Sequence, residues 1–114
     1  MSVIQPVDDH VGTQTRVSTW ASISDTDTCQ SVRSPSAAEK SVQFTGNFAS
    51  GSISFEGSID GTNYETMKDV ENNDVTLTAK AIVTIRDNVQ YCRPSTPTGV
   101  GASITVSILH KQVN

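Results

Sequence analysis

The stretch Val42-Gln43-Phe44-Thr45-Gly46-Asn47-Phe48-Ala49-Ser50-Gly51-Ser52-Ile53-Ser54-Phe55-Glu56-Gly57-Ser58-Ile59 decides the fold class. On both sides of residues 47–51, the large apolar side chains share one parity, with small or polar residues between them. Successive side chains of a strand point to opposite faces, so this pattern predicts two strands, each buried on one face. The short connection at residues 47–51 predicts that the two strands form a hairpin.

The chain reverses directly after this stretch. Asp60-Gly61 supplies the positive φ of a tight turn, and the side chains of Thr62 and Asn63 can cap backbone groups within it. Residues 63–67 then return as a further strand. Turn formation alone explains these residues, while the preference of binding sites for loops makes the tip, residues 60–64, a candidate contact.

Residues 16–24 predict the first strand. Trp20 lies on one face of it, and we expect this ring to be buried against the second sheet rather than exposed. The opposite face carries four residues of alternate parity: Val17, Thr19, Ala21 and Ile23. Residues 1–15 show no sustained period and are interpreted as an extended N-terminal arm, so the expected organisation is an arm over 1–15 and a β-sandwich domain over 16–114.

The remaining apolar runs are short and regularly spaced. Residues 102–111 form the clearest strand, expected to be central or closing, and residues 69–74 form an acidic surface loop. Further strand candidates lie at 29–32, 75–77, 81–85 and 89–91. Seven to nine short strands without a helix predict an all-β fold, either an antiparallel sandwich or a small barrel. We favour a single-domain antiparallel β-sandwich that is Ig-like or jelly-roll-like.

Composition limits the classes of partner. The chain has 114 residues, a net charge of −4 and 35% hydrophobic residues, so it offers few cations for binding nucleic acid. It shows no secretory signal and no apolar run long enough to span a membrane, which predicts assembly in the host cytoplasm, with export by a route without a Sec signal as the alternative. Cys29 and Cys92 are expected as buried free thiols, with a disulfide between them as the alternative.

The sequence offers no catalytic constellation, so we expect neither an enzyme nor a cofactor. The two histidines, His10 and His110, lie in the arm and near the end of the last strand, where a rigid scaffold would not orient them. Three acidic groups could attract a hard cation, but none has the spacing of a calcium loop, and we interpret them as solvated turns without a metal. These groups are Asp8 with Asp9, Asp25 with Asp27, and Asp69 with Glu71 and Asp74.

The order of several motifs resembles small virion proteins of tailed phages that have a β-sandwich fold. The matching segments are an opening strand with a tryptophan, a Gly-Asn-Phe turn, a Glu-Gly-Ser-x-Asp-Gly turn, an Arg-Pro segment and a closing strand: residues 17–20, 41–48, 55–64, 89–94 and 102–109. Tyr64 stands where that family usually has tryptophan, and Cys92, directly before the Arg93-Pro94 pair, has no role that the family implies.

The resemblance implies a structural protein of the phage particle. The first hypothesis is a capsid decoration (cement) protein that binds the outside of the major capsid protein shell as a homo-oligomer, with a trimer favoured. The arm would gain order on binding. The contact candidates are Val3, Ile4 and Val7 in the arm and, more weakly, Asp60, Gly61, Thr62, Asn63 and Tyr64. The alternative is a tail or fibre module that binds host polysaccharide through an exposed Trp20.

Overall fold

The computed structural model describes residues 2–10, 15–33, 37–86 and 89–112, which form strands and no helix. The expected all-β class is confirmed. The strands are β1 (Ser2–Ile4), β2 (Val7–His10), β3 (Thr15–Ile23), β4 (Asp27–Cys29), β5 (Val32–Arg33), β6 (Ala37–Asn47), β7 (Ile53–Ser58), β8 (Glu65–Thr66), β9 (Thr76–Leu77), β10 (Ala81–Ile85), β11 (Tyr91–Pro94) and β12 (Ser103–Gln112). Twelve strands exceed the expected seven to nine because β1 and β2 were not foreseen and the 29–32 candidate divides into β4 and β5.

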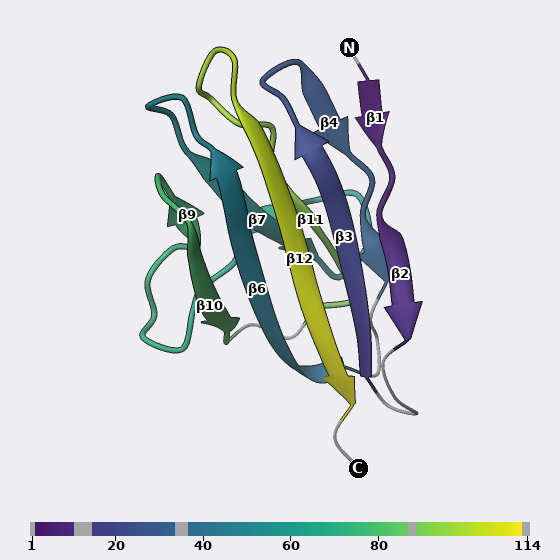
Figure 1. The fold of residues 1–114 in the computed structure, drawn as a ribbon. Coiled ribbons are helices and arrows are strands. Elements are labelled where there is room, and N and C mark those ends of the chain that lie inside the picture. Colours follow the sequence, from purple (N-terminus) through teal and green to yellow (C-terminus); the bar gives the residue numbers. More distant parts are fainter. Residues whose placement is uncertain (1, 11–14, 34–36, 87–88, 113–114) are drawn as a thin grey trace.

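Two sheets pack face to face as a sandwich (Figure 1). The larger sheet has the order β10-β6-β12-β3-β2, and the second has the order β5-β11-β7-β8, with β9 also paired to β7. β12 lies between β6 and β3, so the clearest strand of the sequence is central, as predicted. Pairing is antiparallel except between β1 and β4, which run parallel at the edge.

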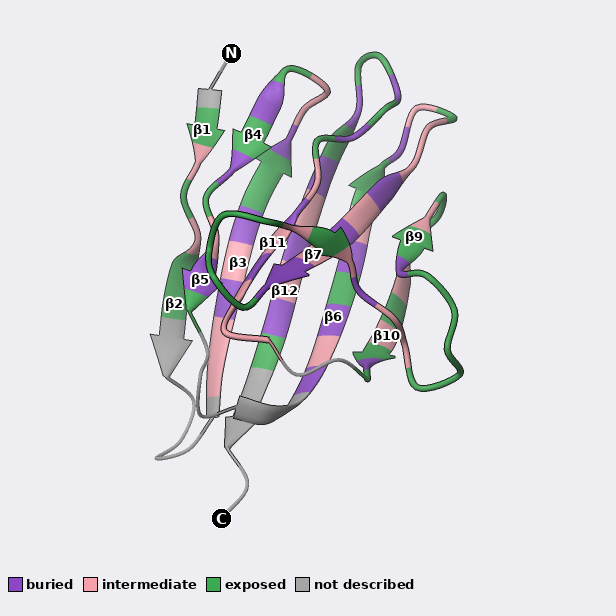
Figure 2. Ribbon diagram, turned by 180° about the vertical axis from the view of Figure 1, so that it is seen from behind, coloured by how far each residue is buried: buried purple, intermediate pink, exposed green. Residues whose placement is uncertain are grey.

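The predicted hairpin between residues 42–48 and 53–59 is wrong. β6 pairs with β10 and β12 in the larger sheet, whereas β7 pairs with β8, β9 and β11 in the second. The connection crosses between the layers through Ala49 and Ser50, whose φ angles are 50° and 61° (Figure 2). Both strands present an apolar face to one interior, and this requirement is met by facing sheets as well as by neighbouring strands.

The expectation that Trp20 and Ile23 lie on opposite faces of β3 is also wrong. Trp20 and Ser18 point into the sandwich and are fully buried, whereas Ala21 lies outside. Ile23 still reaches the interior, because the backbone at Ser22 has a φ of 55° and the register with β12 shifts between Ile104 and Val106. A bulge of this kind reverses which parity faces inward.

Three aromatic rings join the two layers of the core. Trp20 and Phe55 meet edge to face with ring centres 6.0 Å apart, and Phe44 meets Phe55 at 6.5 Å. The indole N–H of Trp20 donates to the carbonyl oxygen of Gln30 at 2.7 Å, so burial leaves this donor satisfied. The expected burial of Trp20 is confirmed.

The described part of the predicted arm belongs to the sheets. β1 pairs with β4 and β2 pairs with β3, so residues 2–4 and 7–10 are extended but attached to the body, and no boundary falls at residue 15. Residues 1 and 11–14 lie outside the described ranges. The sequence signal was weak because edge strands bury only part of one face and need no strict alternation.

Both cysteines are buried and free, as expected. Burial raises the pKa of the Cys29 thiol to about 12, with the nearby Asp27 carboxylate adding to the effect. Because this pKa lies far above 7, the thiol of Cys29, on β4, is a neutral part of the core at neutral pH. Cys92 lies on β11.

Candidate functional site

The predicted turn tip is a rigid exposed loop between β7 and β8. One carboxylate oxygen of Asp60 accepts hydrogen bonds from the backbone N–H groups of Thr62 and Asn63, at 2.8 and 2.9 Å, and from the hydroxyl of Ser58. Its other oxygen accepts from the side-chain amide of Asn63. The backbone N–H bonds of Asn63 and Thr62 are the main reason that the pKa of Asp60 lies well below its usual range.

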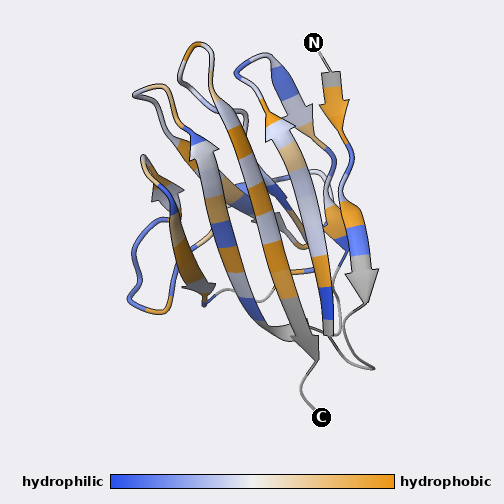
Figure 3. Ribbon diagram, in the orientation of Figure 1, coloured by the Kyte–Doolittle hydropathy of each residue, from blue (hydrophilic) through white to orange (hydrophobic). Residues whose placement is uncertain are grey.

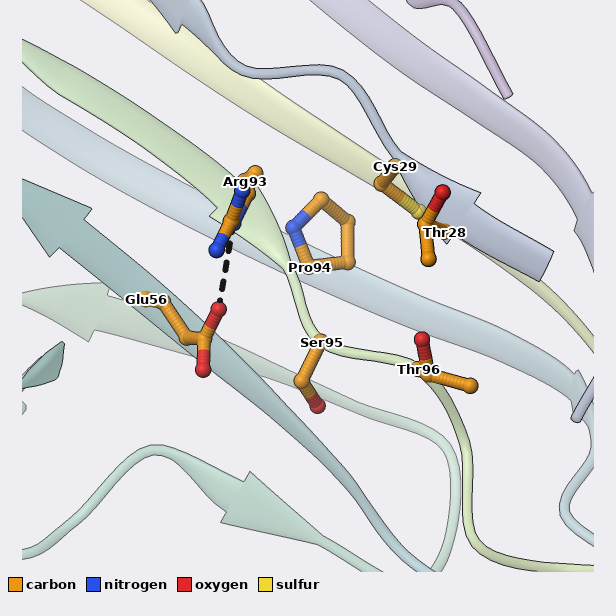
Figure 4. Close-up of a pocket in the computed structure, with 7 residues that line it drawn as sticks. All are labelled: Thr28, Cys29, Glu56, Arg93, Pro94, Ser95 and Thr96. Carbon is orange, nitrogen blue, oxygen red and sulfur yellow. Dashed lines mark hydrogen bonds and ion pairs between the residues drawn. The ribbon is translucent and has the colours of Figure 1, made fainter. Parts of the chain in front are cut away.

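At the end of this loop, Arg93 stacks on Tyr64 and forms an ion pair with Glu56. The guanidinium of Arg93 lies over the ring of Tyr64, and its Nε donates to Oε1 of Glu56 at 3.2 Å. Beside the pair is a hollow of about 220 Å³. Glu56 and Arg93 lie at one end of it, and the hydroxyl groups of Thr28 and Thr96 lie toward the other end (Figure 4). Its lining residues are Thr28, Cys29, Glu56, Arg93, Pro94, Ser95 and Thr96.

The three N-terminal contact candidates have different environments. The side chains of Val3 and Val7 are 62% and 70% exposed, whereas Ile4 is half-buried and packs against the core. The backbone holds this segment in place, since the carbonyl oxygen of Ile4 accepts from the N–H of Gln30 at 2.9 Å. Val3 and Val7 are therefore apolar side chains presented to solvent by strands with fixed backbones.

The structure does not merge the two predicted sets into one site. Val7 lies on β2, an edge strand of the larger sheet, and Val3 lies on β1, which pairs with β4, while the loop of residues 59–64 connects strands of the second sheet. Within the loop, Asp60, Gly61, Thr62 and Asn63 are exposed and Tyr64 is half-buried under Arg93. The sequence did not predict the ion pair between Glu56 and Arg93. Their opposite charges could have indicated it, had the pairing of β7 with β11 been known.

A second surface that the sequence did not predict is the outer face of the larger sheet. The strand register places one residue from each strand in a continuous row: Val7, Thr19, Ser107, Gln43 and Ile82. Paired residues of neighbouring strands project from the same face of a sheet. The two ends of the row are apolar and exposed, with Ile82 at 68%, and the hydroxyls of Thr19 and Ser107 lie 3.1 Å apart between them.

An apolar groove of about 270 Å³ runs along this face. It is lined by Val17, Ser41, Gln43, Ile82, Ser107 and Leu109. The sequence does hint at this apolar groove through Ile82 and Leu109, because each is an apolar residue at a position where the alternation of its strand predicts a polar one. We name the outer face of β10, β6, β12, β3 and β2 the large-sheet face.

The acidic groups serve as local caps and ion pairs. Asp8 accepts from the hydroxyl of Ser18, Asp27 accepts from the backbone N–H of Ser24, and Asp69 accepts from two backbone N–H groups of its own loop. Within the described residues, no three side chains of metal-binding type come together. His10 and His110 both lie in strands, paired through the backbone with Arg16, so His10 is not in a loose arm.

Trp20 supplies no glycan platform, because its ring is fully buried. No helix that could cross a lipid bilayer occurs in the part of the chain that the structure describes.

Comparison with known proteins gives a likeness of fold. No protein-family model and no curated protein matches the sequence. Among solved structures, the SPBc2 prophage-derived protein YomS is similar with a TM-score of 0.60 and 12% identity, over 89% of this chain and 98% of that one. A double-stranded β-helix protein from Klebsiella pneumoniae and the carbohydrate-binding module CBM29-2 have TM-scores of 0.44 and 0.42, with 15% and 8% identity; they cover 95% and 92% of this chain and 74% of each of those chains. The chain therefore has the β-sandwich fold of the prophage-derived protein.

Proposed function

We propose that this chain is a structural protein of a phage particle and acts as a capsid decoration protein on the outside of the major capsid protein shell. Two likenesses support the phage context: the shared fold with the prophage-derived YomS and the order of motifs in the sequence. Neither likeness distinguishes a capsid from a tail position. The capsid position rests on the surface that the chain presents.

The observation that carries the proposal is the exposure of Val3 and Val7 on strands whose backbones are fixed by β4 and β3. Burying an exposed valine side chain against another protein contributes about 1.5–2 kcal/mol at roughly 25 cal/mol per Å² of apolar surface. Because the backbone is already ordered, binding does not incur the entropy loss of ordering a flexible arm. Each copy thus offers a small, rigid apolar contact.

Many such contacts stabilise a shell collectively. A protein that binds the assembled shell and not its separate subunits shifts the equilibrium toward the shell by mass action. When one copy bridges two subunits, separating them also breaks the contacts of the bound copy. Stabilising a shell in this way requires neither a substrate nor a catalytic residue.

The test is co-sedimentation of the purified chain with empty expanded shells of its own phage. We expect the wild-type chain to pellet with shells and the double variant Val3→Glu/Val7→Glu to bind at least tenfold more weakly. Val70→Glu is the matched control, because Val70 is also 62% exposed but lies in the loop after β8. A wild-type chain that stays in the supernatant at every shell concentration contradicts the proposal. Deleting residues 2–10 is a poor test, since it removes two paired strands.

The tail or fibre alternative keeps one observation in its favour, the hollow beside Glu56 and Arg93 with its hydroxyl lining. Polysaccharide recognition through this hollow would show as glycan-array binding that Arg93→Ala abolishes, in a chain that has no affinity for shells. The ring of Trp20 takes no part in this alternative, because it lies inside the core.

A further inference from the structure

A polar groove of about 350 Å³ lies where an edge of the larger sheet approaches an edge of the second sheet. One wall comes from the segment 5–8, which includes the start of the edge strand β2, and another comes from residues 30–33, which include the edge strand β5. The polar lining consists of Gln5, Asp8, Arg16, Gln30, Ser31 and Arg33. We name this hollow the edge groove.

Arg16 spans the edge groove and has more donors than acceptors around it. Its Nη2 donates to the backbone carbonyl oxygen of Arg33 at 2.8 Å, which fixes the guanidinium between β3 and β5. Its Nη1 lies 4.0 Å from Oδ2 of Asp8, beyond hydrogen-bonding distance, and its buried Nε has no acceptor among the described residues. Buried donors in native proteins are nearly always bonded, so an exception of this kind indicates an acceptor that comes from outside the chain.

Asp8 neutralises the edge groove only in part. Its Oδ1 accepts from the hydroxyl of Ser18 at 2.6 Å, which holds the carboxylate on β3, whereas the guanidinium of Arg93 donates directly to Glu56. Among the lining residues that the structure describes, two arginines against one aspartate leave one positive charge, in a chain whose net charge is −4. An anionic group is therefore attracted at this place, although the chain as a whole repels it.

The chemistry of the edge groove suits a single carboxylate. A guanidinium presents its N–H donors in a planar fork that matches the two oxygens of a carboxylate. Gln5, Gln30 and Ser31 add neutral donors for the remaining lone pairs. One positive charge balances one carboxylate, whereas phosphate groups and nucleic acids bring more negative charge. The volume is near the lower end of the range for ligand pockets, about 300–1,000 Å³, so it fits one side chain rather than a long peptide.

The edge groove adjoins the proposed shell contact, which points to the shell as the source of the carboxylate. Val3 and Val7 are exposed on the same short segment that supplies Gln5 and Asp8. Figure 3 shows this segment as orange bands on β1 and β2, with blue between and after them. Strand pairing fixes the backbone of both walls, so a partner that lies along this edge can contact the valines and the groove together.

We propose that the edge groove binds the carboxylate of an aspartate or glutamate on the shell subunit, with Arg16 as its main partner and Arg33 as the second cation. This inference rests on the proposed function and deepens it, because it names the chemistry of the shell surface. The valines supply apolar area, and the groove determines which acidic position of the shell they lie beside. Charge complementarity of this kind contributes to specificity more than to affinity.

Co-sedimentation with empty expanded shells tests the shell as the source. Arg33→Glu should bind about tenfold more weakly than wild type, because a carboxylate in the wall then repels the incoming one. Lys80→Glu makes the same change in net charge at an exposed position before β10, on the opposite edge of the larger sheet, and should bind nearly as well as wild type. Arg33→Lys keeps the charge and should retain most of the binding. Added salt should weaken the wild type more than Arg33→Glu.

A second measurement needs no shell. Tetraglutamate added to the ¹⁵N-labelled full-length chain should shift the Nε–H signal of Arg16 in NMR spectra, whereas tetraglutamine, of equal length and without charge, should not. Arg33→Glu should abolish the shift, and Lys80→Glu should keep it. Because the wild-type titration involves no substitution, its result does not depend on the folding of any variant.

The outcomes separate this inference from the proposed function. If the wild type pellets with shells but Arg33→Glu binds as well as Lys80→Glu, the inference is wrong and the proposed function stands. If the Arg16 signal does not respond to tetraglutamate at any soluble concentration, the groove is not a carboxylate site. If the signal responds but the wild type stays in the supernatant, the proposed function is wrong, and so is the shell as the source of the carboxylate.

Discussion

The guanidinium carbon of Arg93 lies 3.8 Å from the centre of the Tyr64 ring, while the Nε of the same side chain donates to Glu56. A single cation thus ties the end of the β7–β8 loop to both β7 and β11. The planar guanidinium can stack and donate at the same time, which a lysine ammonium cannot do in this geometry. The loop has fixed ends for this reason as well as through its own hydrogen bonds.

Replacing Arg93 by alanine should lower the free energy of unfolding by about 1 kcal/mol, since the cation–π contact and the half-exposed ion pair are both lost. Arg93→Lys should recover only part of this loss. Urea unfolding monitored by circular dichroism measures both effects. Lys80→Ala removes an exposed cation elsewhere and should change stability by much less; equal losses at the two positions would contradict the stacked arrangement.

Replacing Asp60 by alanine should lower the urea midpoint at neutral pH, because four donors lose their acceptor. The folded pKa is lower than the ordinary value of 3.8, so the stabilisation is present above pH 3.8 and is lost as the pH falls through the folded pKa. The wild type should therefore lose its advantage over Asp60→Ala only in strong acid. A difference that already vanishes at pH 5 would exclude this origin.

The Cys29 thiol should make the protein less stable in alkali. Its pKa rises from 9.0 to about 12 on folding, so its contribution is complete below pH 9 and is lost as the pH rises toward 12. Comparing urea unfolding of wild type and Cys29→Ala at pH 8 and pH 10.5 should show a steeper loss for wild type. Lys40, whose pKa burial lowers, contributes the opposite slope in both proteins and cancels from the comparison.

Two glycines with positive φ should respond differently to alanine. A Cβ at Gly46 would lie 2.3 Å from the carbonyl oxygen of Ser103, whereas a Cβ at Gly101 would meet nothing within 4 Å. Gly101→Ala should cost only the left-handed backbone strain, about 1–2 kcal/mol, and Gly46→Ala should cost clearly more. Thermal unfolding of the two variants gives the ranking, and equal losses would mean that the backbone at Gly46 yields easily.

Fluorescence should report the burial of Trp20 directly, because the chain has a single tryptophan. We expect blue-shifted emission and little quenching by acrylamide in the native state, with both properties lost on unfolding. Trp20→Phe should destabilise by about 1–3 kcal/mol, since it leaves the carbonyl of Gln30 without its donor and leaves space in the core. Strong native quenching would contradict the buried position.

Sequence reasoning succeeded where a strand lies between two partners and alternates strictly. In β12, Ile104, Val106 and Ile108 are all fully buried, as their parity predicts. It failed to predict which strands pair within one sheet and which lie in opposite sheets. Alternation shows that β6 and β7 each have an apolar side, but the same pattern arises within one sheet and across two.

The contact residues show the same division. The reversal at Asp60-Gly61 follows from local chemistry, and the sequence predicts it. The expected cap is wrong in its direction, because the carboxylate of Asp60 accepts from the backbone N–H groups of Thr62 and Asn63, whereas the side chains of Thr62 and Asn63 were expected to do the capping. The row from Val7 to Ile82 joins residues far apart in the chain and becomes visible only when the register of five strands is known. The bulge at Ser22 brings Ile23 to the same face as Trp20, and no residue in that segment signals it.

The central place of β12 also governs how the molecule can be built. Before β12 leaves the ribosome, β2 can pair with β3 and β10 with β6, which gives two separate ribbons whose inner edges, on β3 and β6, still lack the partner strand β12. The larger sheet then closes in one late step, when β12 inserts between them. Until that moment the nascent chain presents two unpaired edges to its neighbours, which makes crowded synthesis its most aggregation-prone stage.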